Sequence, residues 1–253
     1  MVDLNIMPPN VFSRKLPMKY SKDGNTTLEA LDGAESFTEW MFEQVKPHLR
    51  GAVLEIGSGR GTYSQKVLRD FPASRVIFSD IDAHYLEMLR GRYVAPRISV
   101  LRIDMENPAD FGQIAASVDS AFALNVLEHT RDDRHSLGNV YDALRPGGRF
   151  VVIVPAHPIL FGAIDRSIGH TRRYTKKELV DAIKGTAFSV RQIYYFNALS
   201  VPGWFIAGRL LKMAYVSPLA AFIYARLVPM MRIIEKHVLR RRFGLSLVAV
   251  LEK

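Results

Sequence analysis

The chain has 253 residues, of which 48% are hydrophobic; this suits one α/β domain with an elaboration or a small subdomain, and excludes a disordered chain. It contains no cysteine, which excludes disulfides, thiolate metal sites and cysteine nucleophiles, and no metal site is expected. The net charge is +9, and residues 197–253 hold nine Lys or Arg against two acidic residues, so the basic character belongs to the C-terminal quarter. The first 22 residues lack an uncharged apolar signal core, so a cytoplasmic location is expected.

The first expected elements are a helix, a strand and a second helix. The first helix, over residues 38–49, would cover the edge of a sheet, and a buried strand follows over residues 52–56. The second helix is expected over residues 62–71. Between strand and helix stand three glycines at alternate positions: Gly57, Gly59 and Gly61. Glycine lets the backbone turn sharply and lie close to a ligand, and the helix N-terminus behind it favours an anionic group.

Glu55 and the glycine loop indicate binding of an adenosine moiety, and the glycine spacing disfavours a nicotinamide dinucleotide as the ligand that carries it. A carboxylate inside a strand is costly unless it faces a ligand amine or hydroxyl. The dinucleotide fingerprint would need Gly or Ala at position 62, where Thr62 stands. A nicotinamide oxidoreductase is therefore disfavoured.

Strands and helices continue to alternate along the chain. Strands are expected over residues 75–79, 98–103, 117–124 and 149–155, with helices over residues 83–92 and 134–144. The segment Arg145-Pro-Gly-Gly148 is expected to stop the second of these helices sharply. The alternation predicts an α/β fold with a doubly wound, mostly parallel sheet, in which a ligand binds beyond the carboxyl ends of the strands.

Acidic residues follow the second and third of these strands. Asp80 stands 25 residues after Glu55, close to the spacing at which an acid meets ribose hydroxyls, and a carboxylate can accept both hydrogens of a vicinal diol. Asp82 is the competing candidate, and Asp80 is favoured because it ends the strand. Asp104 would accept a hydrogen bond from an adenine amino group while Met105 packs on the ring, or it would cap the loop that follows.

Five features in a fixed order resemble the motif series of class I S-adenosylmethionine-dependent methyltransferases. They are the segment 55–61, Asp80, Asp104, Asn125-Val-Leu-Glu-His129 and Leu144-Arg-Pro-Gly-Gly148. The resemblance implies S-adenosylmethionine as the cofactor and S-adenosylhomocysteine as the product. It also implies cofactor contacts from Glu55, Gly57, Ser58, Gly59, Gly61, Asp80, Ile81, Asp104, Met105, Leu124 and Asn125.

The same resemblance covers about residues 37–196 and implies a Rossmann-like sheet of seven strands, the last antiparallel and inserted beside the fifth. Residues 189–196 and 245–252 suit the sixth and seventh strands. The chain is thereby divided into four segments: an N-terminal extension (1–36), the cofactor-binding core (37–196), a helical insertion of apolar and basic residues (197–244) and the last strand of the core (245–253).

A narrower resemblance lies in Val154-Pro-Ala-His157 and Gly169-His-Thr-Arg-Arg-Tyr-Thr175. Both are similar to a bacterial, type 11/12-like methyltransferase subgroup associated with glycan, lipid or secondary-metabolite biosynthesis, which implies in-line methyl transfer to a small-molecule acceptor. Histidine is a suitable general base near neutral pH, and the candidates are His129, His157 and His170. Candidate substrate contacts are Arg172, Arg173 and Tyr174, although pairing of the arginines with Asp165 or Glu178 is the favoured explanation. Tyr20 or Tyr63 would close over the cofactor or serve packing.

The insertion at residues 197–244 has three open interpretations: extra core or a homodimer interface, a lid over an apolar acceptor, or an amphipathic unit on an anionic membrane surface. Its 13 uncharged residues between Lys212 and Arg226 are too few to span a membrane. A nucleic-acid methyltransferase is a rival function, disfavoured because Asn125 is followed by Val-Leu-Glu and not by Pro-Pro-Tyr/Phe; no nucleic-acid partner is expected. A non-catalytic S-adenosylmethionine-binding protein is the other alternative.

Overall fold

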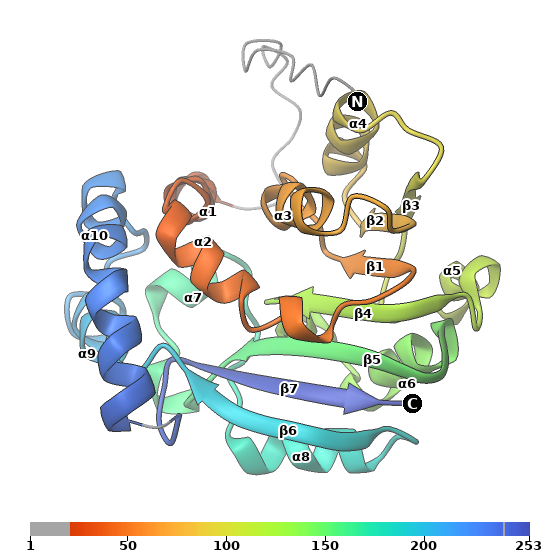
Figure 1. Ribbon diagram of the computed structural model, residues 1–253. Coiled ribbons are helices and arrows are strands. Elements are labelled where there is room, and N and C mark those ends of the chain that lie inside the picture. The colour runs from red at the N-terminus through yellow and green to blue at the C-terminus, as the bar shows by residue number, and fades with distance from the viewer. Residues whose placement is uncertain (1–20, 240) are drawn as a thin grey trace.

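A seven-stranded sheet with helices on both faces forms the centre of the molecule (Figure 1). The computed structural model describes residues 21–239 and 241–253. The strands are β1 (Val53–Ile56), β2 (Val76–Asp80), β3 (Ile98–Arg102), β4 (Val118–Leu124), β5 (Leu144–Pro155), β6 (Ser189–Phe196) and β7 (Ser246–Glu252). Their order is β3-β2-β1-β4-β5-β7-β6; the first five pair in parallel, and β7 runs antiparallel to both neighbours. The predicted fold, with the last strand beside the fifth, is confirmed.

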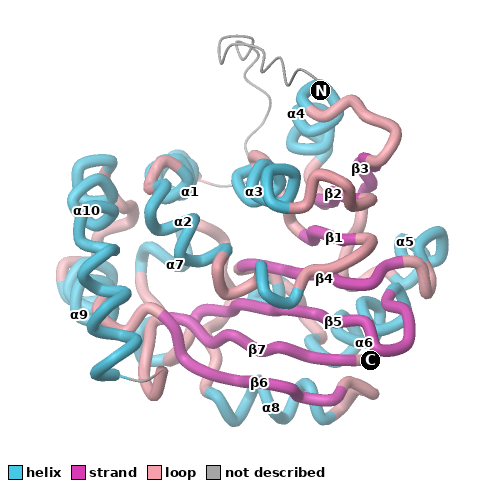
Figure 2. The backbone as a smooth tube through the Cα atoms, viewed as in Figure 1, coloured by secondary structure: helices cyan, strands magenta, loops and turns pink. Residues whose placement is uncertain are grey.

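Two layers of helices cover the sheet because alternate strand residues point to opposite faces. The helices are α1 (Lys22–Asp32), α2 (Glu35–Phe42), α3 (Thr62–Asp70), α4 (Ala83–Arg92), α5 (Pro108–Phe111), α6 (Asp133–Ala143), α7 (Ala163–Ser167), α8 (Lys176–Lys184), α9 (Ser200–Trp204) and α10 (Pro218–Ile234). On one face Val53 packs in a core with Trp40 of α2 and Val228 of α10. On the other, Leu54 packs with Leu137 of α6 and Leu179 of α8. Figure 2 shows the strands between these layers.

Two expected boundaries were wrong. The helix expected over residues 38–49 ends at Phe42, and a separate 3₁₀ turn follows over Lys46–His48. Pro47 explains the break, because proline lacks an N–H and its ring clashes with the preceding helical turn. The fifth strand begins at Leu144 and not at residue 149, since Leu144 already pairs with Val118 across an irregularity in the ladder.

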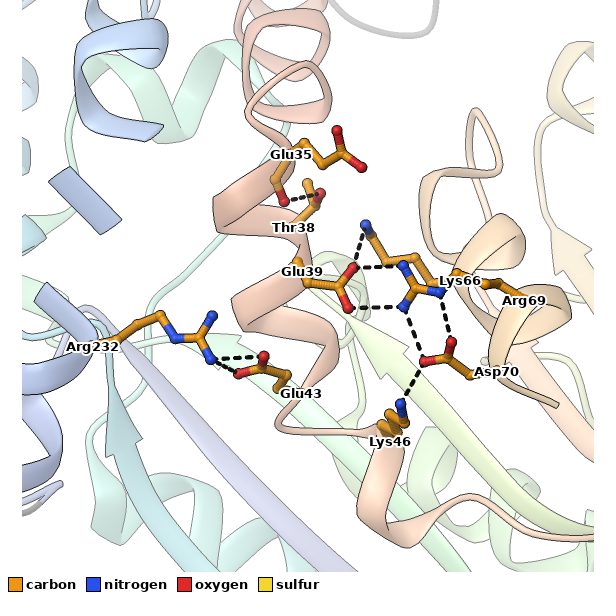
Figure 3. A network of polar contacts seen from close by, with 9 residues as sticks. All are labelled: Glu35, Thr38, Glu39, Glu43, Lys46, Lys66, Arg69, Asp70 and Arg232. Carbon is orange, nitrogen blue, oxygen red and sulfur yellow. Dashed lines mark hydrogen bonds and ion pairs between the residues drawn. The ribbon is translucent and has the colours of Figure 1, made fainter. Parts of the chain in front are cut away.

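The helical insertion is attached to the N-terminal helices (Figure 1). It comprises α9, a π-helical turn (Phe205–Leu210), α10 and a second π-helical turn (Glu235–Leu239). Arg232 of α10 lies 2.5 Å from the Glu43 carboxylate at the end of α2 (Figure 3). The Ser36 hydroxyl donates to the Ala225 carbonyl oxygen at 2.6 Å. The N-terminal helices and the insertion therefore form one layer, although they are far apart in sequence.

The polar network on α2 continues to α3. Both Lys66 and Arg69 pair with the carboxylate of Glu39, and Asp70 joins Arg69 to Lys46 (Figure 3). Arg69, and then Lys66, hold the pKa of Glu39 at about 2. These contacts fix α3, whose N-terminus follows the glycine loop, against the helix that also carries the insertion.

Within the described ranges, no helix combines the length and the apolar character that a bilayer span requires.

Candidate active site

The glycine loop between β1 and α3 allows a ligand to approach its backbone closely at Gly59. Its three glycines all have positive φ, of +73° at Gly57, +50° at Gly59 and +82° at Gly61. A Cβ at Gly57 would lie 2.5 Å from a methyl of Val126, whereas a Cβ at Gly59 would meet nothing within 4 Å. Within the described part of the chain, no side chain caps the N-terminus of α3. The loop thus presents backbone and a helix N-terminus to open space.

Two predicted cofactor acids border this loop. The Oδ2 atom of Asp80 accepts a hydrogen bond from the Gly59 amide at 2.8 Å, and Oδ1 accepts one from the Asp82 amide at 2.9 Å. Glu55 is buried and its Oε2 accepts from the Ser64 hydroxyl at 2.6 Å. Burial raises the pKa of Glu55 to about 8. Asp82, the competing candidate, caps α4 by accepting from the His84 amide. Asp80 is thus held at the glycine loop by backbone amides, whereas Asp82 has a local structural role at α4; the ribose contact of Asp80 stays a prediction.

The remaining predicted cofactor residues lie at the carboxyl ends of β1, β2, β3 and β4. The Ser58 amide donates to the Ser79 carbonyl and ties the loop to β2. Ile81 is 39% exposed directly after Asp80, as an apolar surface for a base requires. Leu124 ends β4, and Asn125 has a left-handed φ of +54°. These placements fit a nucleoside at this edge of the sheet.

Asp104 and Met105 fit the prediction less well. Asp104 Oδ1 accepts from the Glu106 amide at 3.0 Å, which is the capping alternative for the loop that follows. Met105 is 3% exposed and packs in the core with Phe111 and Ile114. Its side chain is therefore committed to the core, and its role against an adenine ring stays a prediction.

A polar cluster lies beyond the end of β4. Glu128 and His129 belong to a 3₁₀ turn (Leu127–His129), and His170 comes from the loop after α7. His170 Nε2 lies 3.2 Å from Glu128 Oε1, and its Nδ1 lies 3.2 Å from Asp165 Oδ1. His129 Nδ1 donates to the Gly169 carbonyl at 2.8 Å. Burial raises the pKa of Glu128 to about 7, although the positive charge of a protonated His170 opposes the shift.

The three candidate substrate contacts are engaged within the fold. Arg173 is 4% exposed and its Nε donates to Asp165 Oδ1 at 2.8 Å. Arg172 donates to the Thr130 carbonyl. Tyr174 is buried, and its hydroxyl donates to Leu127 or Asp133. The structure thus favours a structural role for both arginines over substrate binding, and the partner of Arg173 is Asp165 and not Glu178. A substrate role for these residues stays a prediction.

His157 lies apart from the polar cluster and lines an apolar cavity. It follows β5 with a left-handed φ of +60°. Its ring stacks on Tyr195 at a centroid distance of 5.2 Å and packs against Phe243 at 4.7 Å. Among the described residues its Nε2 has no hydrogen-bond partner. Burial lowers its pKa. The cavity of about 290 Å³ is lined by His157, Ile159, Leu160, Val201, Pro202, Phe205 and Phe243.

Two features of the site were missed from the sequence. Glu128 stands inside the Asn-Val-Leu-Glu-His motif, but its complete burial was not foreseen. Asp165 joins His170, Arg173 and the indole of Trp204, whose Nε1 lies 3.4 Å from Asp165 Oδ2. The only sequence signal for these contacts of Asp165 was its expected pairing with one of the arginines. Tyr63 donates to the sulfur of Met41 in the core, and Tyr20 lies outside the described residues.

Comparisons with known proteins agree with this geometry. Residues 54–150 match a family model described as a methyltransferase domain. Over 140 residues the chain is 32% identical to a probable S-adenosylmethionine-dependent methyltransferase of Mycolicibacterium smegmatis, an alignment that covers 54% of this chain and 52% of that protein. Over 125 residues it is 28% identical to a tRNA U34 carboxymethyltransferase of Cellvibrio japonicus, covering 46% and 37%. The chain thus spans about half or less of these relatives.

The fold comparison agrees as well. The crystal structure of an S-adenosylmethionine-dependent methyltransferase from Mesorhizobium loti has a TM-score of 0.59 with this structure at 18% identity, covering 88% of this chain and all of that one. The family match spans β1 to β5, which carry the glycine loop and the acids described above. The chain therefore carries a class I S-adenosylmethionine-dependent methyltransferase domain, and S-adenosylmethionine is the cofactor of this domain.

Proposed function

We propose that this protein transfers the methyl group of S-adenosylmethionine to a small-molecule acceptor with an apolar portion, such as a natural product or a glycan or lipid intermediate. The observation that carries the proposal is the cavity beside His157, because all of its other lining residues are apolar. Val201, Pro202 and Phe205 of that lining come from the insertion. This supports the lid interpretation for the α9 part of the insertion.

The chain's own residues would act mainly by positioning and by excluding water. The cofactor supplies a methyl group on a sulfonium that a nucleophile attacks in line. Asp80 would accept hydrogen bonds from the ribose hydroxyls, while its contact with the Gly59 amide fixes the carboxylate. The apolar walls around Phe205 would contact the apolar portion of the acceptor.

A proton on an acceptor oxygen or nitrogen would pass to His157. Its ring lines the cavity, and its lowered pKa keeps it neutral near neutral pH. Its buried Nε2 has no hydrogen-bond partner in the described part of the chain, so it would receive the proton only if the acceptor's binding exposes it. His129 and His170 remain alternative bases in the polar cluster.

A nucleic-acid acceptor is the main rival, because the tRNA carboxymethyltransferase is among the relatives. The cavity favours the small molecule, since an apolar pocket does not hold a phosphate backbone. A cytoplasmic location remains a prediction of the sequence.

The test follows a labelled methyl group. The protein is incubated with methyl-labelled S-adenosylmethionine and a cell extract, which is then separated into small-molecule, RNA and protein fractions. We expect label in the small-molecule fraction, at least tenfold less with Phe205→Asp, and unchanged label with Val94→Asp, a control on an exposed loop. Label in RNA would establish the rival. No label in any fraction, with retained cofactor binding, would establish a non-catalytic protein.

A further inference from the structure

Glu128 is a buried carboxylate without a hydrogen-bonding counterpart. It is fully buried, and neither carboxylate oxygen has a hydrogen-bond partner among the described residues. His170 Nε2 lies 3.2 Å from Oε1, but not in a hydrogen-bonding orientation. A charge buried in this way is destabilising unless it is paired or coordinates a metal ion.

Two imidazoles complete a ligand set around this carboxylate. Glu128, His129 and His170 each offer one ligand atom, and the three atoms lie within 4.8 Å of one another. Two ligands of a tetrahedral zinc ion, each about 2.0–2.1 Å from the metal, are about 3.3 Å apart. The 3.2 Å between Glu128 Oε1 and His170 Nε2 matches that edge.

The outer ring nitrogens are held as metal-binding histidines require. A ligating imidazole usually donates its other N–H to a carbonyl or carboxylate, which fixes the tautomer and the orientation. His129 Nδ1 donates to the Gly169 carbonyl, and His170 Nδ1 faces the Asp165 carboxylate. Asp165 is itself fixed by Arg173 and by the Gly162 amide at 2.9 Å. When Glu128 is ionised and both imidazoles are neutral, the carboxylates of Glu128 and Asp165 together with Arg173 carry one net negative charge, which favours a cation.

We propose that Glu128, His129 and His170 bind one divalent first-row transition-metal ion. Two imidazoles and one carboxylate suit Zn²⁺, Fe²⁺, Mn²⁺ or Co²⁺ better than Mg²⁺ or Ca²⁺, which prefer oxygen ligands. Three protein ligands leave at least one coordination position for an oxygen atom, such as that of a water molecule. No metal site was expected from the sequence, because the ligands come from two segments that only the fold brings together.

The test measures metal binding and not activity. Protein without an affinity tag is stripped with chelator, titrated with Co²⁺ and monitored by visible ligand-field absorption, and its Zn²⁺ content is measured after equilibrium dialysis. We expect one ion per chain and at least a tenfold weaker affinity in Glu128→Gln. Because a buried substitution can impair folding, His129→Ala at the edge of the cluster is the second variant, with the same expectation. The control is His135→Ala, an exposed histidine on α6.

Absence of binding by the wild-type protein would overturn the proposal. So would an affinity that His129→Ala leaves unchanged, or one that His135→Ala lowers equally.

The insertion carries a second, independent feature: a stripe of exposed apolar side chains on α10. They recur at helical spacing and are 45–68% exposed: Leu219, Phe222, Ile223, Leu227, Met230 and Ile233. The opposite side of α10 packs on α2 and α1 through residues such as Val228 and Met231. Figure 1 shows α10 at the outer edge of the molecule. An apolar stripe of this kind marks an interaction site.

The charges near this α10 stripe favour a lipid surface over a second copy of the chain as its binding partner. Exposed basic residues lie beside it and on the preceding segment: Arg209, Lys212 and Arg226. Two copies packed stripe to stripe would bring these like charges together. We infer that the α10 stripe binds the surface of an anionic lipid bilayer, with the helix in the plane of the interface.

Vesicle co-sedimentation tests this inference. We expect the protein to pellet with phosphatidylglycerol-containing vesicles at low salt, to pellet less at high salt, and to lose binding in the double variant Ile223→Asp/Leu227→Asp but not in Val94→Asp. No pelleting at low salt, or equal pelleting of the double variant, would overturn it. A dimer without lipid that the double variant abolishes would assign the stripe to a second copy.

Discussion

A methyl group added at Gly57 and one added at Gly59 should have different consequences. Both residues have positive φ, so alanine at either costs roughly 1–2 kcal/mol of stability through its backbone alone. At Gly57 the new methyl would lie 2.5 Å from Val126, a stiff β-branched side chain, and such overpacking adds about 1–3 kcal/mol. We therefore expect Gly57→Ala to lose roughly 2–5 kcal/mol and Gly59→Ala roughly 1–2 kcal/mol.

For cofactor affinity we expect the opposite order of the two variants, with the larger loss in Gly59→Ala. The methyl of Gly59→Ala enters the open space beside the Asp80 carboxylate, where the ligand is expected. At least a tenfold loss of S-adenosylhomocysteine affinity, about 1.4 kcal/mol, is expected at a modest cost in stability. Urea denaturation gives the first quantity and calorimetric titration the second. Equal stability of the two variants would contradict the clash with Val126, and wild-type affinity in Gly59→Ala would contradict a ligand beside Gly59.

Three further predictions follow from single contacts. Burial raises the pKa of Glu55 from 4.5 to about 8, so between these pH values the folded chain keeps a proton that the unfolded chain loses. The free energy of unfolding should therefore fall as pH rises through this window, by up to about 1.4 kcal/mol per pH unit. Glu55→Gln should flatten this slope, as measured by denaturation curves at several pH values. An unchanged slope would show that Glu55 is not the titrating group. Asp80→Asn should weaken S-adenosylhomocysteine binding in calorimetry at least tenfold, and Asp82→Asn less than threefold; the reverse order would assign the ribose to Asp82. The exposed pair of Arg232 and Glu43 should matter little, so Arg232→Ala should change unfolding free energy by under about 1 kcal/mol in urea, and a larger loss would show that the pair anchors α10.

The parallel strands and the cofactor edge could be predicted because local patterns specify them, whereas the place of the last strand came from the family resemblance. Buried apolar strands end in Asp80 or are followed by Gly57 or Asn125, and these positions coincide with the carboxyl ends of parallel strands. The helix expected across Pro47 failed because the apolar periodicity continues past the proline that interrupts it. Periodicity describes which face is buried, whereas backbone chemistry decides where a helix stops.

The polar cluster could not be assembled from the sequence. Glu128 and His170 belong to separate segments, and their contact depends on how the loop after α7 folds back on the end of β4. Asp165 was recognised only as a partner for arginine, although it also holds His170 and contacts Trp204 of the insertion. In α10 both sides are apolar, so its sequence does not reveal which one packs on α2 and which one faces outward.

Calorimetric titration tests directly whether the sheet edge beside the glycine loop binds the cofactor. The wild-type protein should bind one S-adenosylhomocysteine per chain and no NADH, because Thr62 replaces the last glycine of the dinucleotide fingerprint. No heat with S-adenosylhomocysteine, or saturable binding of NADH at the same edge, would contradict the account.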